Sequence, residues 1–140
     1  LAQLRESGDI GNRVAMVNVA DAFGIELAEN ARPAFEAAGF EIVYDTSYPL
    51  GTQALSTVIK GAADTNPDPF VAWSYPPDTF ALTEQAQIEG LNPGAFYTAV
   101  ATAFPAYAGR FGDSIEGVLG IGGVHADGAL SRSTPRVIWK

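Results

Sequence analysis

The chain has 140 residues, 47% of them hydrophobic and 17% charged, which is the size and composition of one globular domain. Its net charge of −8 argues against a nucleic-acid partner, because such a surface repels phosphate groups. The absence of cysteine excludes disulfides, thiolate catalysis and cysteine metal ligands, and no apolar stretch approaches the length of a membrane span.

The N-terminal third predicts a lead-in helix, a strand and a long helix. Residues 1–12 have the pattern of a short helix that ends at a pair of glycines. Residues 14–19 form a nearly continuous apolar run, which is typical of a strand covered on both faces in a parallel sheet. Asp21 is placed to cap the next helix, and Gly39 is placed to end it in the left-handed conformation.

Two features inside this long helix carry their own predictions. Pro33 removes one intrahelical hydrogen bond, so we expect a kink there or an interruption near Asn30. Arg32 lies three and four residues from Glu29 and Glu36, the spacing of ordinary surface ion pairs on a helix.

Beyond Gly39 the apolar runs and helical stripes keep alternating. This alternation predicts an α/β fold: a three-layer αβα, doubly wound, mostly parallel sheet with right-handed crossovers, in the flavodoxin-like or Rossmann-like class. The short length favours the strand order 2-1-3-4-5 over the larger dinucleotide-binding order. The further predicted elements are a strand at 40–47, a helix capped by Thr52, a strand at 70–73, a helix at 76–89 that ends at Gly90, a strand at 95–100, a helix at 102–110, a strand at 118–121 and a short extra terminal strand at 136–139.

In such a sheet, ligands bind where the carboxyl ends of the strands meet, here at residues 18–24, 74–77 and 100–104. The turn after the first strand, VADAFGIE, has one glycine, so the dinucleotide-binding fingerprint is absent. No phosphate-binding loop with lysine is present, and the acids of a phosphorelay receiver are missing. The glycine-rich residues 117–123 are not followed by a clear helix, which favours a turn or a flexible joint over phosphate binding.

The candidate catalytic side chains do not form a set. His125 is the only histidine and is interpreted as a turn residue. Ser74 follows a strand but lacks the glycine-flanked nucleophile elbow. We interpret Asp21 as a helix cap and Trp73 as a core residue. Phe23 and Tyr75 lie at the ligand edge, where a role in ligand binding and a role in packing of the protein are equally compatible with their positions. The sequence therefore predicts no enzyme activity, no catalytic residue, no metal and no cofactor.

Four stretches resemble one family of proteins, in that family's order and spacing, over nearly all of residues 13–120. They are residues 13–43 (RVAMVNVADAFGIELAENARPAFEAAGFEIV), YPLGT with the helix after it, the run from PFVAWSYPPD to QAQIEGLNP, and FGDSIEGVLG. Together they resemble the second lobe of type I periplasmic solute-binding proteins, the branched-chain amino acid class of ABC importers. The resemblance implies a two-lobed receptor that closes on a small molecule and presents it to a membrane permease, in the periplasm or another extracytoplasmic compartment.

By position, the resemblance implies ligand contacts at Phe23, Tyr75 and Val100, with Ser74 and Thr102 beside them at the same strand ends. Relatives that bind amino acids usually have tyrosine in place of Phe23, and often an acid near the place of Val100 to pair with the ligand's ammonium. Because an unpaired buried ammonium is costly, this difference disfavours a standard α-amino acid held by the usual contacts. It favours an aromatic or aliphatic carboxylate, or another neutral or anionic solute.

The C-terminal part departs from the family's arrangement. HADG and the terminal strand resemble a segment that returns to this lobe much later in the family, yet here they follow EGVLG almost directly. The expected organisation is a single ligand-binding lobe over residues 1–140, with 1–120 as the first pass, 121–124 as the joint and 125–140 as the return segment. The opening on Leu1, with no signal-peptide pattern, suits a processed or excised product, and a naturally short relative is the alternative.

Two functional hypotheses follow. The first is a solute-binding lobe from an ABC importer receptor, with weak or no binding in isolation because half a cleft buries only part of a ligand. The alternative is an isolated or engineered flavodoxin-like folding unit without a ligand, which self-associates as a homodimer through the exposed lobe face. A small enzyme or nucleotide-binding protein is disfavoured by the missing loops and nucleophile set.

Overall fold

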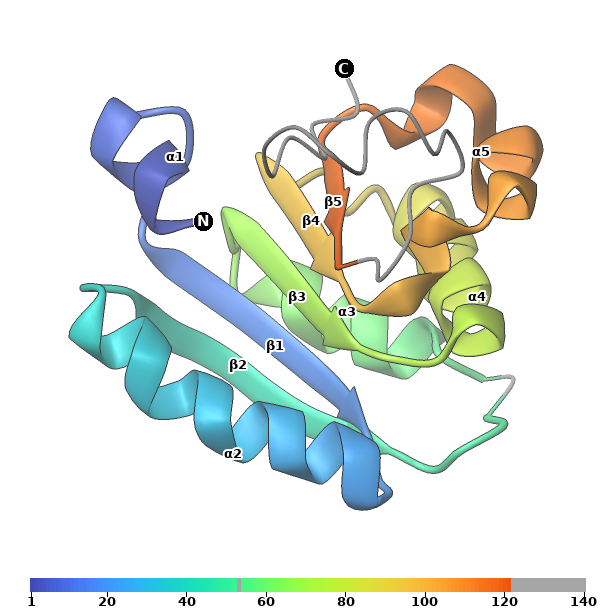
Figure 1. The fold of residues 1–140 in the computed structure, drawn as a ribbon, viewed down its shortest axis with the longest axis horizontal. Helices are drawn as coiled ribbons and strands as arrows, with labels where there is room; N and C mark the ends of the chain where they lie inside the picture. The colour runs from blue at the N-terminus through green and yellow to red at the C-terminus, as the bar shows by residue number, and fades with distance from the viewer. Residues whose placement is uncertain (53, 122–140) are drawn as a thin grey trace, which may run out of the picture.

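In the computed structural model of the chain, which describes residues 1–52 and 54–121, five parallel strands form one sheet in the order β2-β1-β3-β4-β5 (Figure 1). The predicted α/β class and the order 2-1-3-4-5 are therefore confirmed. The strands are β1 (Arg13–Val19), β2 (Glu41–Tyr48), β3 (Pro69–Trp73), β4 (Ala95–Thr98) and β5 (Val118–Gly120). The helices are α1 (Ala2–Ser7), α2 (Ala22–Ala37), α3 (Ser56–Asp64), α4 (Pro76–Glu89) and α5 (Pro105–Phe111), with short 3₁₀ turns η1 (Val100–Ala103) and η2 (Gly112–Ile115).

Several expectations concern residues beyond that range. The terminal strand at 136–139, the return segment 125–140 with His125, and residues 122–124 of the joint lie outside the described residues. Within the described part of the chain, no helix combines the length and the apolar character that a membrane crossing needs.

Strand β1 is an interior strand of the sheet, and both of its faces are apolar. Its residues 14–19 are all buried, and it pairs with β2 on one side and with β3 on the other. Side chains alternate between the faces of the sheet. As a result Val17 and Val19 join the core under α3, α4 and α5, while Val14 and Met16 join the core under α2. Figure 1 shows α2 on one side of the sheet and α3 and α4 on the other.

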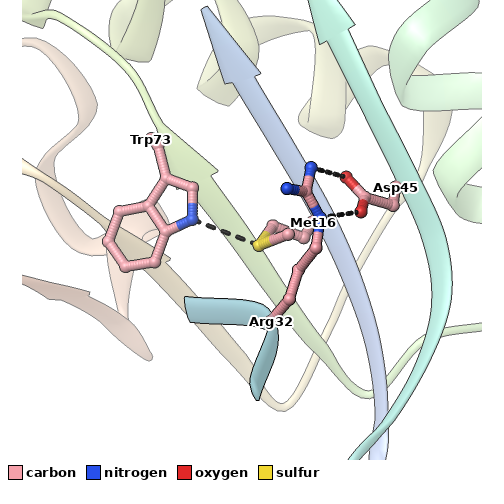
Figure 2. A network of polar contacts seen from close by, with 4 residues as sticks. All are labelled: Met16, Arg32, Asp45 and Trp73. Carbon is pink, nitrogen blue, oxygen red and sulfur yellow. Dashed lines mark hydrogen bonds and ion pairs between the residues drawn. The ribbon is translucent and has the colours of Figure 1, made fainter. Parts of the chain in front are cut away.

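The core under α2 contains a polar contact between two buried side chains. The indole Nε1–H of Trp73 donates to the Met16 sulfur at 3.2 Å (Figure 2). Trp73 is 6% exposed, which confirms it as a core residue. This contact gives the buried indole a partner inside an otherwise apolar layer.

Helix α2 begins and ends where the sequence predicts. The Asp21 carboxylate accepts a hydrogen bond from the Gly24 amide at 2.9 Å, which confirms the cap. Gly39 has φ 78°, the left-handed conformation expected at the end of the helix. The predicted interruption near Asn30 is wrong, because α2 continues through Pro33 to Ala37. Pro33 lies on the exposed side, while the opposite side of the helix packs on the sheet and holds the helix together.

The partner of Arg32 is also different from the expected one. Its guanidinium forms two hydrogen bonds with Asp45 of β2, at 2.6 Å from Nε and 3.2 Å from the second nitrogen (Figure 2). Asp45 comes close because β2 runs beneath this part of α2, so a pair across two elements replaces the predicted pairing with Glu29 and Glu36. The hydrogen bond to Asp45 raises the pKa of Arg32.

Three boundaries near the ends of β2 and β4 differ from the prediction. Helix α3 begins at Ser56 with Leu55 at the N-cap position, and the Thr52 hydroxyl donates to the Pro49 carbonyl oxygen at 2.6 Å instead. Strand β4 ends at Thr98, so the predicted strand to residue 100 is too long and residues 100–103 form η1. The predicted helix at 102–110 begins only at Pro105, whose fixed φ suits a first helical turn.

Candidate functional site

The turns that follow β1, β3 and β4 meet at one edge of the sheet, because all the strands are parallel (Figure 1). We call this the carboxyl edge and define it by residues 20–25, 74–79 and 99–104, together with residues 48–50 at the end of β2 and residue 121 after β5. It is the edge at which open α/β sheets bind their ligands.

Phe23 and Tyr75 form an aromatic stack at the carboxyl edge. Their ring centroids lie 4.9 Å apart, with an angle of 22° between the ring planes. Phe23 belongs to the first turn of α2, and Tyr75 is the N-cap residue of α4. Both side chains are partly exposed. The structure therefore brings together two of the predicted site residues and leaves them accessible.

The carboxyl edge also carries exposed apolar side chains. Val100, the third residue that the resemblance implies, is 37% exposed at the start of η1, and Phe104 close by is 50% exposed. Ile25, Leu50 and Ile121 are exposed as well, and each follows the carboxyl end of a strand. Of the large apolar side chains exposed in residues 1–52 and 54–121, Ile88 is the one that lies elsewhere. Apolar groups collected on one face indicate a surface that contacts a ligand or another surface.

Ser74 and Thr102 lie behind this surface. Ser74 is fully buried, and its hydroxyl lies 2.6 Å from the Thr79 hydroxyl oxygen and 3.4 Å from that of Thr98. Thr102 is 8% exposed and packs closely against Gly120 of β5. Both residues hold neighbouring elements together at the carboxyl edge, and their contact with a ligand stays a prediction.

A buried acid at this edge was missed by the sequence reasoning. Asp78, in the first turn of α4, is 5% exposed, and its Oδ2 has no hydrogen-bond partner among the described residues. The hydroxyl of Tyr48 at the end of β2 is buried and unpartnered in the same sense. An acid in a first helical turn is so common that its position in the sequence gives no sign of burial.

The ionisable groups at this edge affect one another. Burial, and then the charge of Asp21, raises the pKa of Asp78. Burial, and then the charge of Asp78, raises the pKa of Tyr48. A hydrogen bond to Asp21 is the main reason that the pKa of Tyr75 is raised. Asp21 thus caps α2 and also raises the pKa of the Tyr75 phenol.

Asp78→Asn is expected to make the free energy of unfolding less dependent on pH. A carboxyl group whose pKa is raised by folding stabilises the native state fully below its unfolded pKa, here 3.8, and loses that contribution as the pH rises through the folded pKa. Relative to the variant, the parent chain should lose stability between about pH 4 and neutrality. Urea unfolding at several pH values measures this difference, and a difference that grows in the opposite direction would contradict it.

Within residues 1–52 and 54–121, no three histidine, aspartate or glutamate side chains are grouped so that they could hold a metal ion. The described carboxyl edge therefore offers aromatic, apolar, hydroxyl and carboxylate groups. Such a surface can bind a small organic molecule.

Comparison with known proteins identifies the family. A family model described as "Periplasmic binding protein" matches residues 1–134. A search of curated proteins found no match.

Similar solved structures include a leucine-, isoleucine-, valine-, threonine- and alanine-binding protein from Brucella ovis, with TM-score 0.72 and 20% identity over 80% of this chain and 28% of that one. A putative branched-chain amino acid ABC transporter protein from Rhodospirillum rubrum has TM-score 0.71 and 23% identity over 84% of this chain and 33% of that one. A solute-binding protein from R. palustris in complex with 4-hydroxybenzoate has TM-score 0.70 and 19% identity over 81% of this chain and 31% of that one.

This chain therefore spans about a third of the length of each of these structures, which fits one lobe of a type I receptor. By the match of the family model to residues 1–134, the chain belongs to the periplasmic binding protein family.

Proposed function

We propose that this chain is the solute-binding lobe of an extracytoplasmic receptor that serves an ABC importer. Its ligand is a small organic molecule of the amino acid or organic acid class, held on the carboxyl edge. The observation that carries the proposal is the accessible stack of Phe23 on Tyr75, with Val100 exposed at the same edge. A similar fold in complex with 4-hydroxybenzoate, and another named for binding leucine, isoleucine, valine, threonine and alanine, add support.

The proposed mode of binding is the packing of an apolar or aromatic body against this stack. The two rings are held in place by two different helices, α2 and α4, that begin at the edge. A rigid aromatic surface gains contact area with a ligand at a small cost in conformational entropy. This lobe covers one side of a ligand, so affinity of the isolated chain is weak, and the receptor with its second lobe is the form that presents the solute to a membrane permease.

Calorimetric titration of the chain with a panel of amino acids and aromatic acids tests the proposal, alongside the same panel with the missing lobe restored. We expect weak binding by the chain and tighter binding by the two-lobed receptor. Phe23→Ala should weaken the binding of the best ligand about tenfold, since the ring supplies a large part of the apolar contact. Ile88→Ala, which truncates an exposed apolar side chain elsewhere, serves as the control. Binding that Phe23→Ala leaves unchanged would contradict the assignment of the site.

The exposed apolar side chains also favour a second candidate function, a folding unit that associates with itself. Leu50 and Phe104 are 60% and 50% exposed at the carboxyl edge, and two copies can cover them by pairing through this edge. Light scattering over a wide concentration range decides between the two. A dimer that Phe104→Ser dissociates supports self-association, whereas a monomer at every concentration leaves the edge free for a solute.

A further inference from the structure

A cavity of about 240 Å³ lies at the end of the sheet opposite to the carboxyl edge. It is lined by the end of α4, the start of β4 and the start of β5. The two strands are joined there, because the Phe96 amide donates to the Gly117 carbonyl oxygen at 3.1 Å. At Gly90, where α4 ends, an added Cβ would meet no atom within 4 Å, so the space beside the helix end is open. We call this space the amino-end cavity.

The floor of the amino-end cavity is apolar. It is formed by three buried side chains that are each 5–6% exposed, Ala86 of α4, Phe96 of β4 and Val118 of β5. Leu91 and Pro93 line the cavity as well and are half-buried. An apolar cavity of about 150 Å³ is sufficient to bind benzene. The amino-end cavity therefore has room for one six-membered ring with a small substituent.

Two amide side chains, those of Gln87 and Asn92, line the exposed part of the cavity. The Gln87 amide nitrogen donates to the Ser114 hydroxyl oxygen at 2.9 Å, and this bond joins α4 to η2 beside the cavity. Within residues 1–52 and 54–121, the Gln87 oxygen and the Asn92 side chain make no hydrogen bond. Because a side-chain amide both donates and accepts, these two residues can pair with either kind of polar group on a ligand.

The charge of the lining limits the class of ligand. Among the described residues that line the cavity, Glu116 is the one with a charged side chain, and it forms no ion pair with the rest of them. An anionic ligand would meet this carboxylate with no basic group beside it to offset the repulsion. A cationic ligand would gain little from it, because Glu116 is exposed to water and exposed ion pairs contribute about 0–1 kcal/mol. The lining therefore favours an uncharged ligand.

We propose that the amino-end cavity is a second binding site, for an uncharged molecule with one aromatic ring and one amide or hydroxyl substituent. The ring packs against the apolar floor, and the substituent forms hydrogen bonds with Gln87 and Asn92 where the cavity opens to water. The proposal goes beyond the function proposed above and does not depend on it, because none of the residues that line this cavity belongs to the carboxyl edge.

Benzamide, benzoate and benzylamine test the class of ligand, because they share one ring and differ in charge at pH 7. The chain is titrated with each probe, and the resonances of the Phe96 ring report on the cavity. Benzamide should shift these resonances with an affinity at least about tenfold higher than that of benzoate and no lower than that of benzylamine. Phe23→Ala, which alters the carboxyl edge, should leave the response of the Phe96 ring unchanged.

Two substitutions on α4 test the placement of the ligand. Ala86→Leu fills the floor of the cavity with a good helix former and should abolish the response of the Phe96 ring. Ala106→Leu, which makes the same change at an exposed position of α5, is its matched control.

Gln87→Ala removes one amide from the opening of the cavity without filling it. It should weaken the binding of benzamide about threefold to tenfold and leave the binding of toluene, which has no polar group, unchanged. Gln85→Ala, on the same helix but outside the lining, should change neither. Urea unfolding shows whether each variant is folded, and Gln87→Ala decides the placement if Ala86→Leu does not fold.

Three results would overturn the proposal. Tighter binding of benzoate or benzylamine than of benzamide would contradict the uncharged class. A Phe96 response that a folded Ala86→Leu variant retains, or that Gln87→Ala leaves equal for benzamide, would contradict the placement. No response of the Phe96 ring to any probe would mean that the cavity binds none of them. The rings of Phe23 and Tyr75 report separately on the carboxyl edge, so a failure here is distinguishable from a failure of the proposed function.

Discussion

Gly24→Ala is expected to lower the free energy of unfolding by about 3 kcal/mol and to disturb the Phe23–Tyr75 stack. A Cβ at this position would lie 2.1 Å from the Val19 carbonyl oxygen and 2.7 Å from the nearer Val19 methyl carbon. The Val19 oxygen is backbone in the interior strand β1, so it cannot turn aside as a flexible side chain would. The first turn of α2 would have to move away from β1, and Phe23 would move with it.

Urea unfolding of the variant and NMR of the Phe23 ring measure both effects. Gly109→Ala is the matched control, because a Cβ at that position of α5 meets no atom within 4 Å. It should be neutral or slightly stabilising, since alanine favours the helix. A Gly24→Ala variant as stable as the parent chain, with an unchanged stack, would show that α2 tolerates displacement and that the close approach to β1 does not position Phe23.

Phe70→Ala is expected to cost about 3–5 kcal/mol, the usual range for removing a buried phenylalanine. Phe70 lies in β3, is completely buried, and packs edge-on against Phe96 of β4 with ring centroids 4.9 Å apart. Its loss opens a cavity between the sheet and the layer of α3, α4 and α5. Because β3 leads directly into Tyr75, the same change should reduce binding at the carboxyl edge.

Phe104→Ala provides the comparison for this substitution. The same side chain is removed, but Phe104 is 50% exposed at the carboxyl edge, so its effect on stability should stay within about 0.5 kcal/mol. Thermal and urea unfolding of both variants give the comparison. Similar losses from the two variants would mean that burial in this core does not determine stability.

The same elements that stabilise the sheet also place the candidate site. The Asp21 side chain caps α2, which orients Phe23, and it raises the pKa of Tyr75 at the start of α4. Contacts between hydroxyl groups connect the ends of β3 and β4 to α4. They join Ser74, Thr79 and Thr98, with oxygen–oxygen distances of 2.6–3.4 Å. The carboxyl edge is therefore a rigid surface supported by buried polar contacts, which suits a site that must hold a ligand in one orientation.

Much of this arrangement could be predicted from the sequence because its signals are local. Residues 14–19 are apolar without alternation, as a strand buried on both faces must be, and this placed β1 inside a parallel sheet. Asp21 and Gly39 mark the ends of α2 through capping chemistry that involves only neighbouring residues. The positions of Phe23 and Tyr75 at the carboxyl edge follow from the strand order alone.

Other features were decided only by the tertiary structure, because they depend on contacts between segments that are distant in the sequence. Helix α2 continues through Pro33 because packing on the sheet outweighs one lost hydrogen bond. Arg32 pairs with Asp45 because β2 passes beneath it. Asp78 is a buried acid in the first turn of α4, and burial and the charge of Asp21, from the turn after β1, raise its pKa. Burial and charge at a site depend on which segments meet there, and the spacing of residues along one segment does not contain that information.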